Sequence, residues 1–419
     1  MSTFSISTSP CDENAGNVPV SSIFSNEQIY QGAVDAMSVR NIEFGSISGH
    51  DQFFSTFRKF SKAIPGREGE MLAEVANRAA RQNTHYLELI VVFGIFEASS
   101  LRHGVSHQYT DDDLKTLVDG KEIDEIAGQV ISLTDRAEAK MRDILQCQTK
   151  SPKPGCSVEI RYLPAMIRVF PRTALISQAA IAFSLVARDS RYVGVNLVAP
   201  EDSRIALQDY DWQMQLLQDM ANQFSTPIPR TLHAGELDLG LVPPEALKDH
   251  ISKAVHKAGA RRIGHGVSVG FEHDYPVLLE TMKNQGILVE INLTSNEIIL
   301  GVQGKRHPFL SYLNAGVPMS LSTDDEGVSR IDLTHEYQKA VETYNISYAT
   351  LKSLSRNALE YSFLPGESLF TEPRHFQRVE ACKQMESRVC KKFISPSEKA
   401  RLQRQLEERF LRFEQSLAF

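Results

Sequence analysis

The sequence lacks the features that mark membrane-spanning and nucleic-acid-binding chains. No apolar run approaches the roughly 20 residues that a membrane helix requires, and residues 1–28 have neither the basic start nor the apolar stretch of an export signal. The 45 Lys and Arg residues form no long basic run and are outnumbered by 52 Asp and Glu, which leaves a net charge of −7. We therefore expect neither a membrane nor a nucleic acid as partner.

Cysteine is scarce as well. The five cysteines are odd in number and widely scattered, which fits neither a zinc knuckle nor a disulfide framework. We expect reduced thiols at Cys11, Cys147, Cys156, Cys382 and Cys390. The remaining composition, with 42% hydrophobic and 23% charged residues, is that of an ordinary globular protein. A chain of 419 residues can hold one large barrel with extra helices, or two domains.

From Tyr86 onward, strand-like and helix-like segments alternate. The candidate strands are Tyr86–Phe93, Val158–Leu163, Tyr192–Val198, Arg230–His233, Arg262–His265, Ile287–Asn292 and Val317–Ser322. Amphipathic segments lie between them, a pattern typical of βα units around a parallel sheet. The sequence therefore predicts an α/β fold, a TIM-like (β/α) barrel. Because such a barrel has eight strands, the missing one should precede Tyr86, and the barrel should lack its first strand.

The chain divides into three parts by composition. Residues 1–28 are rich in Ser, Pro and Asn and are expected to form a loose leader. Residues 29–365 hold the barrel, and residues 366–419 form a charged helical extension. The last helix should begin at a cap formed by Ser395 or Ser397 and pack on the barrel exterior or in a dimer contact. An oligomer is therefore possible.

Three short motifs place polar side chains directly after predicted strands, where a parallel barrel keeps its catalytic groups. TLHAGE ends at Glu236, RIGHG contains His265, and STDD contains Asp324. His233 and His265 are 32 residues apart, and His265 and Asp324 are 59 apart, close to one and two βα units of about 30 residues. One cavity can collect them all.

These residue types suit metal-assisted hydrolysis. A zinc ion lowers the pKa of a bound water to about 7, and a nearby carboxyl group can shuttle the proton to the leaving group. His233 and Asp324 are the metal candidates, and Glu236 is the candidate shuttle. Asp325 follows Asp324 directly, so in an extended backbone their side chains would point apart and serve different tasks.

Together with NLTSN at residues 292–296, these motifs resemble the successive signatures of the adenosine and AMP deaminase family. DAMSVRN (35–41), GHDQFFSTFRKF (49–60) and VGVNLVAPED (193–202) are similar to a bacterial and fungal branch related to the secreted adenosine deaminases. The likeness covers roughly residues 8–365. It implies a zinc-dependent hydrolase that converts adenosine or 2'-deoxyadenosine to inosine and ammonia.

The resemblance also implies a role for each residue. His233 and Asp324 would bind zinc, and Glu236 would protonate N1 of the purine. His265 would orient the attacking water, while Asp325 would form a hydrogen bond with the ring at N7. The backbone of Gly194 would approach the purine closely.

One departure from the family pattern concerns the metal. Family members carry a His-x-His pair on the first barrel strand, whereas this chain has no histidine before His50. Catalytic zinc usually has three protein ligands, so His233 and Asp324 alone would hold it poorly. The chain thus looks truncated at its front, where relatives would also carry an export signal, and the compartment stays open.

Two alternatives follow. The chain can be a truncated or noncatalytic member that binds purines, or an amidohydrolase with another substrate, since one fold hosts many reactions. Glu236 and Asp325 argue against the latter. AMP in place of adenosine would require phosphate-binding groups, which the sequence does not identify.

Other polar residues have simpler interpretations. Structural roles are expected for His50, His85, His103 and His107, because none has the spacing that would replace the lost pair. Glu88 can face the barrel centre or pair with Arg161 of the next strand. Ser295 and Asn296 can line the pocket or merely shape a turn.

Overall fold

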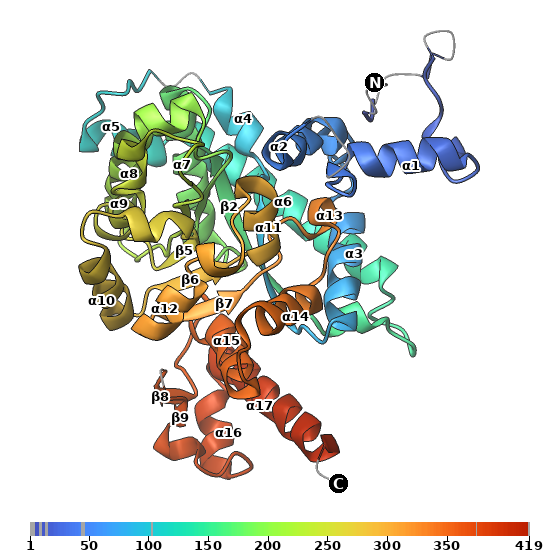
Figure 1. Ribbon diagram of the computed structural model, residues 1–419. Coiled ribbons are helices and arrows are strands. Elements are labelled where there is room, and N and C mark those ends of the chain that lie inside the picture. Colours follow the sequence, from blue (N-terminus) through green and yellow to red (C-terminus); the bar gives the residue numbers. More distant parts are fainter. Residues whose placement is uncertain are drawn as a thin grey trace.

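The computed structural model describes residues 5–7, 11–12, 16–42, 47–101, 104–373 and 375–417 (Figure 1). Its centre is a set of parallel strands that follow one another along the chain. They are β1 (Tyr86–Val91), β2 (Glu159–Ile167), β3 (Asn196–Val198), β4 (Thr231–Ala234), β5 (Arg262–His265), β6 (Leu288–Ile291) and β7 (Met319–Leu321). Each lies within, or overlaps, a strand that the sequence predicts. The fold is the expected α/β barrel.

Neighbours in the chain are neighbours in space. Strands β1 to β3 pair in order, as do β4 to β7, and all of these pairings are parallel. Backbone bonds join the two groups, because the N–H of Val195 donates to Pro229 and the N–H of Thr231 donates to Val195, both at 3.0 Å. The carboxyl ends of the strands therefore gather at one end of the barrel.

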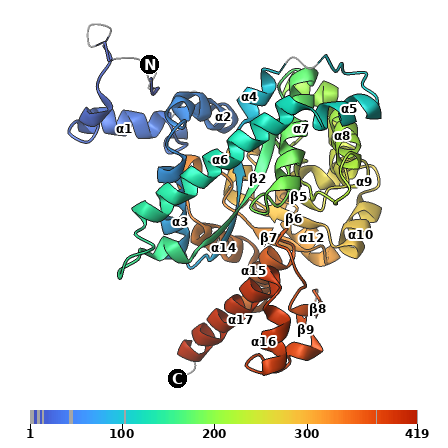
Figure 2. The same ribbon diagram turned by 180° about the vertical axis from the view of Figure 1, so that it is seen from behind.

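Helices surround the strands (Figures 1 and 2). Those that follow or precede strands are α3 (Glu68–Arg81), α4 (Ile95–Ser99), α5 (Asp111–Val118), α6 (Lys121–Ile144), α7 (Arg172–Arg188), α8 (Arg204–Asn222), α9 (His250–His256), α10 (Tyr275–Gln285), α11 (Leu293–Leu300), α12 (Phe309–Ala315), α13 (Glu326–Ser329), α14 (Leu333–Tyr344) and α15 (Tyr348–Glu360). Two more, α1 (Glu27–Ala36) and α2 (Gly49–Phe60), precede them in the chain. Helix α2 packs on α11, beside the carboxyl ends of the strands.

An open seam separates β1 from β7. In the described part of the chain, no strand pairs with the outer edge of either one. A cavity of about 2590 Å³ extends along this seam, between side chains of β1, β7, α3, α14, α15 and the last helix. The architecture agrees with the predicted barrel that lacks one strand, and the seam leads to the interior of the barrel.

Charged side chains fill the amino-terminal layer of the barrel. Oε2 of Glu88 lies 2.6 Å from Nη1 of Arg262, which also places its Nε 2.7 Å from Glu290. Glu88 thus faces the barrel centre, one of its two expected positions. Arg161 pairs instead with Glu398 at 2.5 Å.

The C-terminal part covers the amino ends of the strands, at the bottom of Figure 1. It comprises the hairpin of β8 (Phe370–Glu372) and β9 (Gln377–Arg378), followed by α16 (Arg388–Ile394) and α17 (Glu398–Leu417). Ser397 caps α17, because its Oγ accepts the N–H of Ala400 at 3.0 Å. Leu402 of α17 packs in one cluster with Tyr86 of β1. The predicted packing on the barrel exterior is thereby confirmed.

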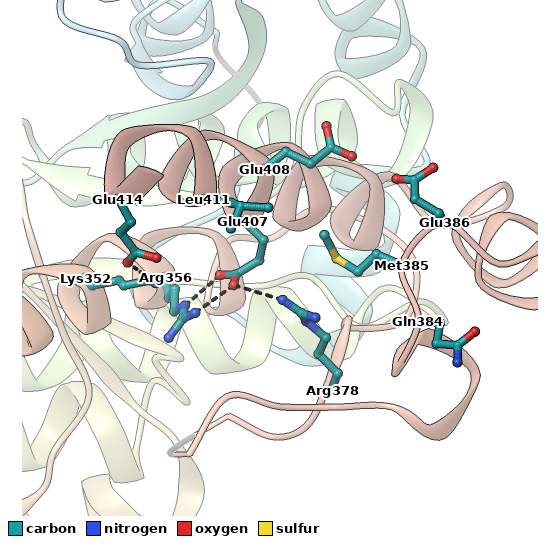
Figure 3. Close-up of a pocket in the computed structure, with 10 residues that line it drawn as sticks. All are labelled: Lys352, Arg356, Arg378, Gln384, Met385, Glu386, Glu407, Glu408, Leu411 and Glu414. Carbon is teal, nitrogen blue, oxygen red and sulfur yellow. Dashed lines mark hydrogen bonds and ion pairs between the residues drawn. The ribbon is translucent and has the colours of Figure 1, made fainter. Parts of the chain in front are cut away.

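Paired charges hold this part together (Figure 3). Glu407 of α17 lies between Arg356 of α15, at 2.6 and 2.7 Å, and Arg378 of the hairpin, at 3.6 Å. Lys352 pairs with Glu414 at 2.5 Å beside a cavity of about 510 Å³. Because these charges are already neutralised by one another, the cluster serves to join α15, α17 and the hairpin.

The expectation of reduced cysteines is wrong. Cys147 bonds to Cys156 and Cys382 bonds to Cys390, which leaves Cys11 free. The two pairs are separated by only 9 and 8 residues, and their Cα atoms lie 5.5 and 4.5 Å apart, within reach of a disulfide. Considered as one scattered set, the five cysteines do not reveal the two pairs that are close in sequence.

Among the helices of the described residues, none has the length and apolar character needed to cross a bilayer.

Candidate functional site

The structure brings five of the six predicted site residues to one end of the barrel. His233 lies on β4, Glu236 in the loop after it, His265 at the end of β5, and Asp324 and Asp325 after β7. All five line the large cavity. The donor atoms of His233, His265 and Asp324 lie within 4.8 Å of one another, close enough to surround a single metal ion.

Gly194 is the exception. It precedes β3, at the amino end of that strand, where an added Cβ would lie 2.5 Å from the ring of Phe363. Gly194 therefore packs against Phe363 and is not among the residues that line the cavity. At the carboxyl end of the same strand the cavity is lined by Ala199, which has a left-handed φ of 84°.

His233 is held as a neutral ligand. Its Nδ1 lies 2.9 Å from Oδ1 of Asn196, and because an amide oxygen only accepts, Nδ1 carries the proton and Nε2 keeps a free lone pair. Burial lowers the pKa of His233 well below its usual range, and nearby His265 and Arg168 lower it further. An imidazole in this state is ready to bind a metal ion.

A relay of hydrogen bonds orients His265. Nδ1 of His307 accepts the N–H of Phe309 at 3.1 Å, so Nε2 of His307 donates to Oδ1 of Asn296 at 3.1 Å. The amide nitrogen of Asn296 then donates to Nδ1 of His265 at 2.9 Å. Burial lowers the pKa of His265. Neutral His265 consequently carries its proton on Nε2, where it can donate to a water or an anion.

Asp324 is fixed by its backbone and by a serine. Its φ is 55°, and its Oδ2 accepts the hydroxyl of Ser295 at 2.7 Å. The extended backbone assumed for the Asp324–Asp325 pair is therefore wrong, and the two carboxyl groups interact. Burial raises the pKa of Asp325 well above its usual range, and the charge of Asp324 and a hydrogen bond between the two side chains add to this. Ser295 and Asn296 thus position site residues from α11.

Glu236 is buried beside these groups. Its Oε1 lies 3.2 Å from Nδ1 of His265. Burial raises the pKa of Glu236 well above its usual range, and the charges of Asp324 and Glu201 raise it further. This carboxyl group therefore keeps its proton to a higher pH than an exposed glutamate does, which suits a proton donor.

The side chains present fit a metal ion. His233 supplies an imidazole lone pair and Asp324 a carboxylate oxygen, both of which are ligands of catalytic metal sites. His50, His85 and His107 lie outside this group, as expected. His50 contacts Asp202 at 3.1 Å, and Nε2 of His85 donates to the carbonyl of Leu402 at 3.2 Å. His103 lies outside the described residues.

Sequence reasoning missed several supporting residues. Asn196, Glu201 and Arg168 contact the segment that carries His233 and Glu236, and His307 orients His265 through Asn296. Glu201 lies in the loop after β3, so its place near a strand end is a signal that could have marked it. His307 carries no such signal, because it reaches Asn296 from a 3-10 segment.

Comparison with known proteins points to one family. The sequence model described as Adenosine deaminase matches residues 48–369. The adenosine deaminase of Enterococcus faecalis is 34% identical over 178 residues, which cover 42% of this chain and 47% of that protein. The adenosine deaminase of Shewanella loihica is 38% identical over 135 residues, 32% of this chain and 38% of that protein. The alignments thus span less than half the length of these relatives.

Solved structures share the fold. The structure of Arabidopsis ADAL complexed with IMP has a TM-score of 0.54 and 20% identity, covering 83% of this chain and 89% of that chain. An adenine deaminase from Arthrobacter aurescens has a TM-score of 0.51 and 15% identity, covering 84% and 88%. An amidohydrolase with bound Zn from Burkholderia ambifaria has a TM-score of 0.50 and 17% identity, covering 71% and 68%.

The residues matched by the family model include every side chain of the site, from Arg168 to Asp325. Five of these side chains line one cavity in the structure, namely His233, Glu236, His265, Asp324 and Asp325. This chain belongs to the adenosine deaminase family.

Proposed function

We propose that this protein hydrolytically deaminates adenosine or 2'-deoxyadenosine to inosine and ammonia, with zinc held by His233 and Asp324. The observation that carries the proposal is the buried Glu236, whose pKa is raised, next to a lone-pair imidazole and a carboxylate in one cavity. When bound, zinc would lower the pKa of a water molecule to near 7. The remaining tasks fall to the protein's own side chains.

Each side chain has one task in this reaction. Glu236 gives its proton to N1 of the purine, which makes the ring carbon at C6 more open to attack. His265 holds the attacking water through its Nε2 proton and stabilises the charge that develops there. Asp325 binds the ring at N7. The apolar side chains Phe53 and Phe57 of α2 line the same cavity and can exclude water from a bound purine.

We favour a nucleoside over a nucleotide substrate. The carboxylates of Asp324 and Glu326 line the cavity around the site, and a 5'-phosphate would face them. Arg78 of α3 also lines the cavity, but it is paired with Glu74 at 3.0 Å and Glu326 at 3.4 Å. Turnover should therefore be faster with adenosine than with AMP.

The test is to measure zinc per chain and the ultraviolet absorbance change that accompanies conversion of adenosine to inosine. Near one zinc per chain with inosine formation supports the proposal. A folded chain that neither binds zinc nor turns over would instead be a noncatalytic member. The small ligand set favours that second candidate, because among the described residues only His233 and Asp324 are assigned to the metal, whereas catalytic zinc usually has three protein ligands.

We also propose that the protein resides in an oxidising compartment. Two disulfides form within the described residues, and disulfides persist in exported proteins and are rare in the cytosol. Comparing thiol oxidation in the protein isolated from its native source with that of the recombinant chain tests this assignment.

A further inference from the structure

Glu201 is a buried carboxylate that bonds the backbone of the turn carrying Glu236. It follows β3 and is 2% exposed. Its Oε1 accepts the N–H of Gly235, and its Oε2 accepts the N–H of Glu236, both at 3.0 Å. Because each oxygen accepts a different N–H, the carboxylate spans two successive residues of the turn.

The turn itself leaves little freedom. Gly235 has a φ of 74°, and an added Cβ would lie 2.7 Å from Ile251 and 2.8 Å from Ser268. The carbonyl of Gly235 accepts the N–H of Ser268 at 2.9 Å. Glu201 thus bonds the peptide groups before and after Gly235, and Ser268 bonds the second of them as well, which holds the turn at a positive φ that favours glycine.

Glu201 is itself fixed from behind. Nδ1 of His250 lies 2.6 Å from its Oε1, and Nη1 of Arg168 lies 3.9 Å from its Oε2. The His250 ring stacks on Tyr210 with ring centres 3.6 Å apart, and the Tyr210 hydroxyl donates to the carbonyl of His250 at 2.8 Å. Glu201 is therefore unsuited to contact a substrate, because its hydrogen-bond partners already surround the carboxylate.

We propose that Glu201 is a positioning residue that aims the Glu236 carboxyl group into the cavity by clamping the Gly235–Glu236 turn. The inference rests on the proposed function, because proton donation by Glu236 is one of its steps. Loss of one acceptor would leave a buried N–H unpaired, and the turn would relax. A shift of about 1 Å in a reacting group can lower turnover by about a hundredfold.

The first experiment replaces Glu201 with Gln. The amide keeps one acceptor oxygen but turns a donor toward the second N–H, so kcat should fall tenfold or more while KM and zinc content stay near wild type. Glu201→Leu, which keeps no acceptor, should lower kcat further. The order wild type, Gln, Leu separates positioning from a general loss of packing.

The chain offers a matched control in Glu360. This carboxyl group is also buried and also accepts two hydrogen bonds, from the hydroxyl of Ser368 at 2.5 Å and the amide of Gln403 at 2.7 Å, but these partners belong to the C-terminal part. Glu360→Gln should leave kcat within about threefold of wild type, because neither partner contacts the Gly235–Glu236 turn. Equal losses of kcat in Glu201→Gln and Glu360→Gln would overturn the proposal.

A second measurement needs no turnover. Residue-resolved hydrogen exchange should show slow exchange of the Gly235 and Glu236 amides in the wild-type chain, although both lie in a loop, and faster exchange in Glu201→Gln. Fast exchange in wild type, or unchanged exchange in the variant, would refute the clamp. If the wild-type chain binds zinc but deaminates nothing, the proposed function fails while the exchange data still decide the role of Glu201.

Discussion

Ser295 shows how a single hydroxyl can support a metal ligand. It donates to Oδ2 of Asp324 at 2.7 Å and fixes that carboxylate. Partners of this kind are worth about 10- to 100-fold in metal affinity, so Ser295→Ala should weaken zinc binding by that factor in a competition assay with a chelator. Ser362→Ala is the control, because Ser362 also buries its hydroxyl but donates to the Leu359 carbonyl, away from the site.

Glu236 carries the proton in the proposed reaction. Glu236→Gln keeps the shape of the side chain but removes the transferable proton, so turnover should fall by about a hundredfold or more. Zinc per chain should stay constant, since Glu236 is not one of the proposed ligands. Unchanged turnover in a zinc-loaded variant would remove the proton-shuttle role.

For single residues, motif spacing could predict which side chains come together but not which contacts hold them in place. His233, Glu236, His265, Asp324 and Asp325 follow strands, and parallel strands bring such positions together. The orientation of the Asp324 carboxylate depends on its left-handed φ of 55°, which a non-glycine sequence does not announce. Likewise, the proton position on His265 depends on contacts with residues far away in the chain.

Ser397 caps the last helix, α17. The Ser397 hydroxyl accepts the N–H of Ala400 and donates to the carbonyl of Glu367 at 2.6 Å, so it joins α17 to the preceding loop. Ser397→Ala should lower the free energy of unfolding by about 1 kcal/mol in urea denaturation. Ser395→Ala, at the exposed alternative position, should change it by much less.

Two disulfides join residues that are close in sequence, near the ends of helices. Cys147–Cys156 closes the connection between α6 and β2, and Cys382–Cys390 ties the start of α16 to the segment before it. For loops of this length, each bond adds about 2 to 3 kcal/mol by restricting the unfolded chain. Replacing both residues of one pair with Ser should lower the unfolding midpoint accordingly, whereas Cys11→Ser should leave it unchanged. Thiol labelling of the denatured, unreduced chain should find Cys11 alone.

Strand positions were predictable because short strand-like segments alternate regularly with amphipathic helical segments along the chain. Helix boundaries were less so. The amphipathic segment at residues 244–257 divides into a 3-10 turn at Pro244–Leu247 and α9, since the N–H groups of Ile251 and Ser252 are bonded by Glu272 from another segment. Contacts of this kind override a local pattern.

For the whole molecule, buried neutral histidines predict sensitivity to acid. Burial lowers the pKa of His85 to about 4 and that of His307 to about 3. The unfolded chain binds these protons near pH 6.5 and the folded chain does not, so their contribution to stability is complete above about pH 6.5. It is lost as the pH falls toward 4 for His85 and toward 3 for His307.

Thermal unfolding between pH 8 and pH 4 checks this expectation. The midpoint should fall on the acid side, and His85→Asn should flatten the fall, because one titrating group, worth up to about 3 kcal/mol, is gone. His107→Asn is the control, since His107 is exposed. An identical pH dependence in both variants would show that His85 does not contribute.

The overall fold was easier to predict from the sequence than the details of single residues or helices, because alternation of strands and helices is compatible with few architectures. The position of α17 beneath Tyr86 was not predictable in detail, since it depends on long-range contacts such as that of Leu402 with His85.

Because of the open seam, the row of strands has two edges, formed by β1 and β7. A closed ring of strands has no place where separation is easiest, whereas here β1 and β7 border the gap and should fray before the strands between them. His233 and Glu236 belong to the middle of this row, but Asp324 follows the border strand β7. A metal ion bound by both His233 and Asp324 would therefore link the central strand β4 to the edge strand β7. Metal occupancy and the stability of the barrel should then increase and decrease together.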